Sequence, residues 1–182
     1  MVLTGGDCRN AKDTHLKQAI EIGVDEALKA LAESLSDLTD EQFWAFPVPG
    51  RNNIAWIAMH CLDNLDDCAV EKHTGARLYA SEWRWDLWQG SATDRPKPGD
   101  SFPGVAEVLS RLAAIREAAT RALAEASDES LLRHVGDDPD KSEAADWYVR
   151  TTYHTMAHVR QIWLLRGALG LGSGAWPRQH WE

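Results

Sequence analysis

Apolar residues recur at steps of three and four along four long stretches of the chain, and this spacing is typical of one face of an α-helix. The stretches cover about residues 13–37, 53–74, 102–126 and 142–169. In the first stretch, the repeating positions are Leu16, Ile20, Val24, Ala27, Leu31 and Leu35. Because no convincing alternation of the kind that marks a half-buried strand is seen, the pattern predicts an all-α fold built from four helices.

Residues that cap or end helices stand at the predicted boundaries: Thr39 with Gln42, Asn52 or Asn53, Pro103, Asp140 with Glu143, and Gly170. The Thr39-x-x-Gln42 spacing predicts a capping box over one short helical turn. An asparagine can cap the second long helix, and the Asp140-x-x-Glu143 spacing predicts the start of the fourth. Pro103 is expected in the first turn of the third helix, and Gly170 is expected to end the fourth.

The connection between the second and third helices is long. Residues 76–100 contain Trp83, Trp85 and Trp88, followed by the sequence DRPKPGD, whose prolines do not fit regular structure. A connection of this length inside a compact domain is often a lid or a binding loop. The sequence therefore predicts a four-helix bundle with a long crossover between helices two and three, formed by residues 1–182 as a single domain.

The chain is acidic, with 19 Lys and Arg residues against 28 Asp and Glu residues and a formal net charge of −9. Nucleic acids and anionic membranes select positive protein surfaces, so this balance argues against both as partners. Acids gather on the second helix and arginines on the fourth: Asp63, Asp66, Asp67, Glu71, Arg150, Arg160 and Arg166. The two groups either face each other or lie on separate solvated surfaces.

Three cysteines, Cys8, Cys61 and Cys68, do not provide an even set for a disulfide framework. Cys61 and Cys68 stand on one predicted helix about 10 Å apart along its axis, which is too far for a disulfide bond. We therefore expect a reducing, cytoplasmic setting. The N-terminus lacks a signal-peptide pattern, and no apolar run approaches the ~20 residues that cross a bilayer.

His154 and His158 stand four residues apart in the most apolar helix of the chain. At this spacing both imidazoles lie on one helix face and can hold a divalent transition metal such as Zn²⁺, Ni²⁺ or Fe²⁺. The alternative is two packed histidines that hydrogen-bond to backbone or water. A metal site needs a further ligand, and the second helix offers His60, although its place beside the apolar stripe also fits a boundary histidine.

The fourth helix has two predicted faces, neither of which suits full exposure to water. One contains Ala145, Val149, Thr152, Met156, Val159 and Trp163, and the other contains Trp147, Thr151, His154, His158, Gln161 and Leu165. A helix that is apolar on two sides usually has two packing partners. In a small bundle the second partner is often another subunit, so we expect a homodimer.

Several catalytic patterns are missing from the sequence. No histidine is preceded at three residues by glutamate, so the Glu-x-x-His pattern of di-iron bundles is absent. The patterns HExxH, G-x-S-x-G and CxxC and a phosphate-binding glycine loop are absent as well. Cys61 follows His60 directly and therefore points away from it on a helix, so we expect Cys61 in the core rather than as a nucleophile.

Two segments of the chain resemble the DinB-like superfamily of four-helix-bundle proteins. They are LTDEQFWAFPVPGRNNIAWIAMHCLDNLDD and YHTMAHVRQIWLLRGALG, the second with an H-x-x-x-H-x-x-Q pattern, and the ending WPRQHWE is similar too. The resemblance runs from about residue 13 to the end and is weakest at 76–100. It implies one divalent metal held by His60, His154 and His158, with an open coordination position.

The resemblance also implies a chemistry. Related bundles include transferases and isomerases that use low-molecular-weight bacterial thiols such as bacillithiol or mycothiol, where the metal lowers the pKa of the thiol. This favours a metal-dependent transferase that acts with such a thiol on a small-molecule substrate, in stress or detoxification. A metal-dependent hydrolase on the same three ligands and a non-catalytic metal-binding or interaction bundle are the alternatives.

Aromatic and polar side chains near the predicted site have two interpretations each. Trp56, Trp147 and the tryptophans at 83–88 could wall a substrate pocket, or they could pack in the core and in the long connection. Gln161 lies near the histidine face, where it could orient a ligand imidazole or form an ordinary interhelical hydrogen bond.

Overall fold

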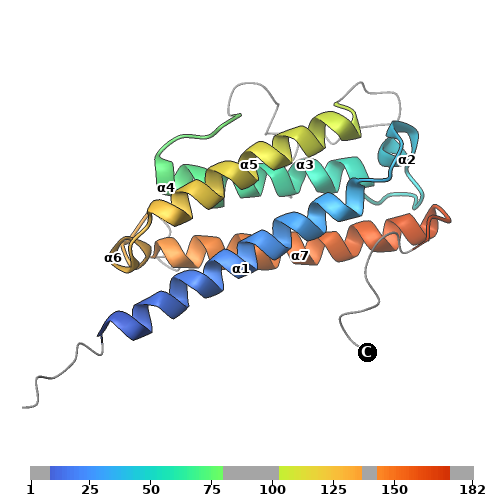
Figure 1. Cartoon of the computed structure of the whole chain (residues 1–182). Coiled ribbons are helices and arrows are strands. Elements are labelled where there is room, and N and C mark those ends of the chain that lie inside the picture. The colour runs from blue at the N-terminus through green and yellow to red at the C-terminus, as the bar shows by residue number, and fades with distance from the viewer. Residues whose placement is uncertain (1–8, 80–102, 137–142, 173–182) are drawn as a thin grey trace, which may run out of the picture.

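The computed structural model describes residues 9–79, 103–136 and 143–172. Four long helices form the bundle (Figure 1): α1 (Arg9–Leu35), α3 (Ile54–Leu65), α5 (Val105–Glu125) and α7 (Ala144–Ala168). Shorter elements extend or join them: α2 (Asp40–Trp44), the π-helix η1 (Asp66–Glu71), α4 (Lys72–Thr74) and α6 (Asp128–Leu131). Within these ranges the one β feature is an isolated bridge between His134 and Glu143, so the all-α prediction is confirmed.

Helices α1 and α7 run side by side in one direction, and α3 and α5 run in the other (Figure 1). Lys17 near the start of α1 donates a hydrogen bond to the carbonyl oxygen of Ala124 near the end of α5, at 2.9 Å. Because α3 and α5 are parallel neighbours, the chain between Thr74 and Val105 has to return along the whole bundle. The predicted crossover is therefore present, and Trp83, Trp85 and Trp88 within it lie outside the described residues.

Side-chain caps fix the ends of the short α2 and of α3. The predicted capping box forms, since Thr39 Oγ1 accepts from the Gln42 amide at 3.2 Å while Gln42 Oε1 accepts from the Thr39 amide at 2.9 Å. Of the two asparagines before α3, Asn53 is the cap, and its Oδ1 accepts from the Trp56 amide at 2.8 Å. These caps satisfy amides that an uncapped helix leaves unpaired.

The starts of α5 and α7 differ from their predicted positions. Helix α5 begins after Pro103, because Asp40 Oδ1 of α2 accepts from the Val105 amide at 2.8 Å and so caps α5 from another helix. Helix α7 begins at Ala144 with Glu143 as its cap, whereas Asp140 lies outside the described residues. The predicted stop is confirmed, since Gly170 has the positive φ of 73° that glycine adopts most easily.

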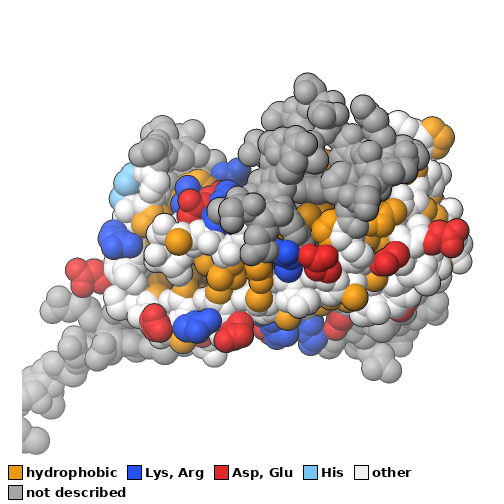
Figure 2. All heavy atoms as spheres, turned by 90° about the horizontal axis from the view of Figure 1, so that it is seen from above, with side chains coloured by type: hydrophobic (Ala, Val, Ile, Leu, Met, Phe, Trp, Pro, Cys, Tyr) orange, Lys and Arg blue, Asp and Glu red, His pale blue; other side chains and the backbone are white. Residues whose placement is uncertain are grey.

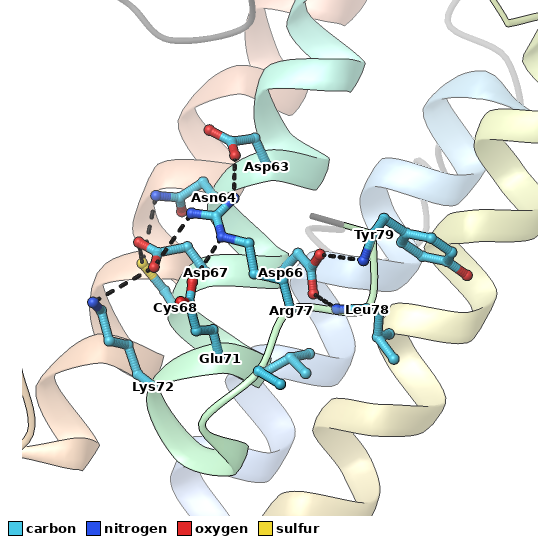
Figure 3. A network of polar contacts seen from close by, with 12 residues as sticks. Asp63, Asn64, Asp66, Asp67, Cys68, Glu71, Lys72, Arg77, Leu78 and Tyr79 are labelled. Atoms are coloured by element: carbon cyan, nitrogen blue, oxygen red, sulfur yellow. Dashed lines mark hydrogen bonds and ion pairs between the residues drawn. The ribbon is translucent and has the colours of Figure 1, made fainter. Parts of the chain in front are cut away.

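The second predicted helix is continuous but changes to π-helical geometry in η1, where the buried Asp66 accepts from the amides of Leu78 and Tyr79 (Figure 3). The guanidinium of Arg77 pairs with Asp63 at 2.6 Å and with Glu71 at 2.7 Å. The acids of this helix are thus paired at the start of the crossover rather than with the arginines of α7. Burial raises the pKa of Asp63 and Asp66, although bonds from Arg77 and from the two amides partly oppose the shift.

The surface and the interior of the bundle have the composition of an ordinary globular protein. Leu31, Leu35, Ile54, Leu65 and Ile115 are among the fully buried side chains at its centre. Figure 2 shows acidic and basic side chains interspersed on one face, without a continuous basic surface among the described residues. No described helix is long and apolar enough to cross a membrane.

The C-terminal part of α7 is tied to the end of α1 by a buried arginine. Arg166 is 1% exposed, and its two terminal nitrogens donate to both carboxylate oxygens of Asp37 at 2.7 and 2.8 Å. One of them also donates to the Ser34 carbonyl oxygen at 3.1 Å, and the guanidinium lies over the Trp163 ring. The hydrogen bonds from Arg166 hold the pKa of Asp37 below its usual value, which shows that the pair favours the charged carboxylate.

Substituting Asp37→Asn should reduce the free energy of unfolding by roughly 1–3 kcal/mol, because it leaves a buried guanidinium without its counter-charge. The matched control is Asp25→Asn, which removes the carboxylate of the exposed ion pair with Arg116 and should change the free energy by only about 0–1 kcal/mol. Urea unfolding followed by circular dichroism measures both. Equal losses for the two variants would contradict this account of Arg166.

Candidate metal centre

Three histidines from two helices meet at the side of the bundle. His60 comes from α3 and His154 and His158 from α7, and one ring nitrogen of each lies within 4.8 Å of the others. The Nε2 atoms of His60 and His154 are 2.9 Å apart. Among the described residues, this is the group of His, Cys, Asp and Glu side chains whose spacing could hold a metal ion.

The position of the three rings follows from the pairing of α3 with α7. His154 and His158 are one turn apart on α7, and the antiparallel α3 places His60 opposite them, with ring centroids 4.7 and 4.9 Å away. One turn below, the buried Thr151 of α7 donates to Asn64 Oδ1 of α3 at 2.9 Å. This bond between the helices fixes their register next to the histidines.

The buried stripe of α7 does not coincide with either predicted face. It contains Tyr148, Thr151, Thr155, Val159 and Ile162, and it lies between the two. The histidines therefore stand on the flank of this stripe and are half-buried. Such a position combines a dry side towards the core with an approach from solvent, which a ligand-binding site needs.

Gln161 controls the orientation of one histidine. Its Oε1 lies 2.9 Å from His158 Nδ1, and because an amide oxygen only accepts, Nδ1 is the protonated nitrogen. The other nitrogen, Nε2, is then left with a free lone pair. The hydrogen bond joins two residues of α7, so among the described contacts it is not the interhelical bond considered as an alternative, and it fits the interpretation of Gln161 as a partner that orients His158.

The environment keeps His154 and His158 neutral, and this suits metal binding. Burial, followed by the neighbouring His158, His60 and Arg150, lowers the pKa of His154 to about 3. Burial also lowers the pKa of His158, against a smaller opposing effect of Gln161. A neutral imidazole is the form that binds a metal, so these two rings, together with His60 at this spacing, fit a divalent transition metal.

Comparison with known proteins shows the family of this chain. The sequence model of the DinB superfamily matches residues 24–162. The chain belongs to the DinB superfamily. The crystal structure of a conserved protein from Enterococcus faecalis is also similar, with a TM-score of 0.61 and 17% sequence identity over 84% of this chain and 96% of that one. At this identity the likeness concerns the fold alone. A search among curated proteins gave no match.

The remaining described histidines of this DinB protein lie away from the centre. His15 and His134 are exposed. His73 stacks on Tyr148 with ring centroids 3.8 Å apart and hydrogen-bonds the Cys68 carbonyl oxygen, and burial lowers its pKa to about 4. These contacts pack the end of α4 against α7. His180 lies outside the described residues.

Two tryptophans expected near the site have different positions in the DinB bundle. Trp56 stacks on the His60 ring at 5.0 Å, with the planes inclined by 16°, so it forms one wall of the centre. Trp147 instead donates from Nε1 to the Val135 carbonyl oxygen at 3.1 Å, two turns before His154, and its described contacts are with that loop and with two cations. Its expected role as a direct wall of the histidine cluster is not seen among these contacts.

Substituting Gln161→Leu should weaken metal binding by about 10- to 100-fold, because losing a partner that orients a ligand imidazole has this effect at metal sites. Leucine has a similar volume but no acceptor for His158 Nδ1. The measurement is a competition titration of the purified protein with a zinc chelator. The neighbouring exposed residue supplies the control, Arg160→Gln, which should keep wild-type affinity. An unchanged affinity in Gln161→Leu would show that His158 needs no such partner.

Proposed function

We propose that this DinB protein binds one divalent transition metal through His60, His154 and His158 and transfers a low-molecular-weight thiol to a small electrophile. The supporting observation is the convergence of the three imidazoles within 4.8 Å at a half-buried flank of the bundle. Three protein ligands with access for a fourth group are typical of catalytic sites, whereas structural sites are closed. Zn²⁺, Ni²⁺ and Fe²⁺ are all suited to imidazole ligands.

The residues of the chain have separate parts in the proposed reaction. The three histidines would hold the cation, and Gln161, which hydrogen-bonds Nδ1 of His158, would leave its Nε2 available as the ligand atom. Trp56 covers one side of the His60 ring and limits the access of water. When bound, the cation would supply Lewis-acid chemistry, which lowers the pKa of a thiol towards neutral pH.

The nucleophile has to come from outside the described part of the chain. Cys61 and Cys68 are fully buried, and burial raises the pKa of both thiols far above neutrality. A buried thiol with a raised pKa is a poor nucleophile. This supports a thiol co-substrate. Because such a co-substrate must stay reduced and its transfer removes reactive electrophiles, we place the activity in stress or detoxification within a reducing, cytoplasmic setting.

The proposal is tested with protein purified without a histidine tag. We expect about one metal per chain by elemental analysis and metal-dependent loss of free thiol when bacillithiol or mycothiol is mixed with a panel of activated halides and epoxides. His158→Ala should lower both the bound metal and the metal-dependent loss of thiol by more than about 100-fold. The reason is that losing a metal ligand weakens metal binding more than losing a residue that only orients a ligand. His134→Ala, which changes an exposed histidine, should behave as wild type.

Other results of the same experiment would reject the transferase. Turnover of ester or amide substrates without any thiol would identify a hydrolase on the same ligands. A metal that raises the melting temperature, with no turnover of either kind, would identify a bundle that the metal only stabilises.

The outer face of α7 supports a second proposal, that two copies of the chain form a homodimer. Val149, Tyr153 and Leu164 on this face are 43%, 75% and 74% exposed. On α1, Ile22 is 58% exposed. Large apolar side chains grouped on a surface are typical of an interface, where their burial stabilises the complex.

Substituting Tyr153→Glu should convert the dimer to a monomer, because it places a charge in the centre of an apolar contact. Sedimentation velocity at micromolar concentration measures the change in mass. Arg121→Glu on α5 is the control, since Arg121 is exposed and belongs to a different face. A wild-type protein that sediments as a monomer would refute the dimer.

A further inference from the structure

Arg150 stands at the solvent side of the histidine cluster. It precedes His154 by four residues on α7, so it lies one turn away and about 40° further from the buried stripe. Both Arg150 and Gln161, which stands beyond His158, are exposed, whereas the histidines between them are half-buried. Arg150 therefore stands on the solvent side of the cluster, one turn from His154.

Arg150 differs from five other arginines of the bundle in its partner. Five arginines in the described ranges form ion pairs with carboxylates: Arg77, Arg111, Arg116, Arg121 and Arg166. Within the same ranges Arg150 has no ion pair, and its contact is with the face of the Trp147 ring, 5.4 Å from the ring centroid. In a chain with a net charge of −9, this guanidinium one turn from His154 is therefore not paired with a carboxylate of the described residues.

Trp147 gives this guanidinium a defined direction. The indole is buried, and its Nε1 donates to the Val135 carbonyl oxygen, so the ring is fixed. Lys72 lies over the same ring at 5.0 Å, but it also faces Asp67 at 3.6 Å and so has a carboxylate partner. A guanidinium that rests on an aromatic face keeps its edge of N–H donors available for a planar anion.

We propose that Arg150 binds a carboxylate of the small molecule that reaches the three-histidine centre, and so selects anionic substrates. This inference rests on the proposed function and adds the chemical class of the substrate. A single guanidinium balances one negative charge and matches the two oxygens of a carboxylate. A phosphate monoester, with a charge of about −1.5 to −2 at pH 7, would need further donors.

The test uses full-length protein loaded with Co²⁺, whose absorption in the near ultraviolet reports a sulfur ligand directly. The probes are N-acetylcysteine and N-acetylcysteine amide, which share the thiol and differ in the carboxylate. We expect the acid to bind about tenfold more tightly than the amide, as a charge-assisted bidentate contact predicts. In Arg150→Gln this ratio should fall to near one, in Arg150→Lys it should be intermediate, and in the control Arg160→Gln it should equal wild type.

A carboxylate on the electrophile instead of the thiol is distinguished by a second titration. Succinate, which has no thiol, is titrated into protein that already holds the amide probe, and its binding is measured by calorimetry. If succinate binds and Arg150→Gln weakens this binding about tenfold, as the loss of a charge-assisted contact predicts, the result supports the inference. It then assigns the carboxylate to the electrophile rather than to the thiol.

Two outcomes overturn the inference, and they differ in what they say of the function. If the sulfur ligand is seen but neither the acid-to-amide ratio nor succinate binding changes in Arg150→Gln, then Arg150 selects nothing and the thiol transferase stands. If neither thiol gives the near-ultraviolet absorption in the wild-type protein, the proposed function fails and the inference fails with it.

Discussion

The hydrogen bond between Thr151 of α7 and Asn64 of α3 joins the two helices on which the whole site is built. Both residues sit one turn from the histidines, and Thr151 is completely buried. A polar pair in the interior tolerates little displacement, because a shift of one helix along the other would leave both groups unsatisfied. The register of α3 against α7 is thereby specified, and with it the meeting of His60 with His154 and His158.

The same pairing explains why the centre lies at a flank rather than in the core. The inner surface of α7 is filled by Tyr148, Thr155, Val159 and Ile162, which pack against the other helices. The histidines occupy the next positions around the helix, where one side is covered by α3 and the other faces solvent. A cation held there would have protein ligands on one side and an approach for small molecules on the other.

The charges near the centre are arranged so that few of them compete for a substrate. Arg77 holds the acids of the second helix, Asp63, Asp67 and Glu71, and Arg166 pairs with Asp37 at the far end of α7. Arg150 rests on Trp147. The lowered pKa values of His154 and His158, the hydrogen bond of His158 to Gln161 and the position of Arg150 over Trp147 are the features that support the proposed selection of an anionic molecule.

Much of this could be predicted from the sequence. The spacing of apolar residues determined four helices, and the local caps Thr39 and Asn53 determined where the short α2 and the long α3 begin, because both signals act within a few residues along the chain. The i, i+4 spacing of His154 and His158 placed them on one face for the same reason. His60 as their partner came from resemblance to a family, since its position along the second helix does not indicate which helix it faces.

The tertiary structure decided what depends on contacts between distant segments. The rotation of α7 could not be derived, because Thr151 and Thr155 are polar yet buried while Val149 and Leu164 are apolar yet exposed, so hydrophobicity misplaces the buried stripe. The start of α5 depends on a carboxylate from α2, and the acids of the second helix pair with an arginine of the crossover. Such long-range pairs leave no periodic trace in the sequence, since they are determined by how the helices pack.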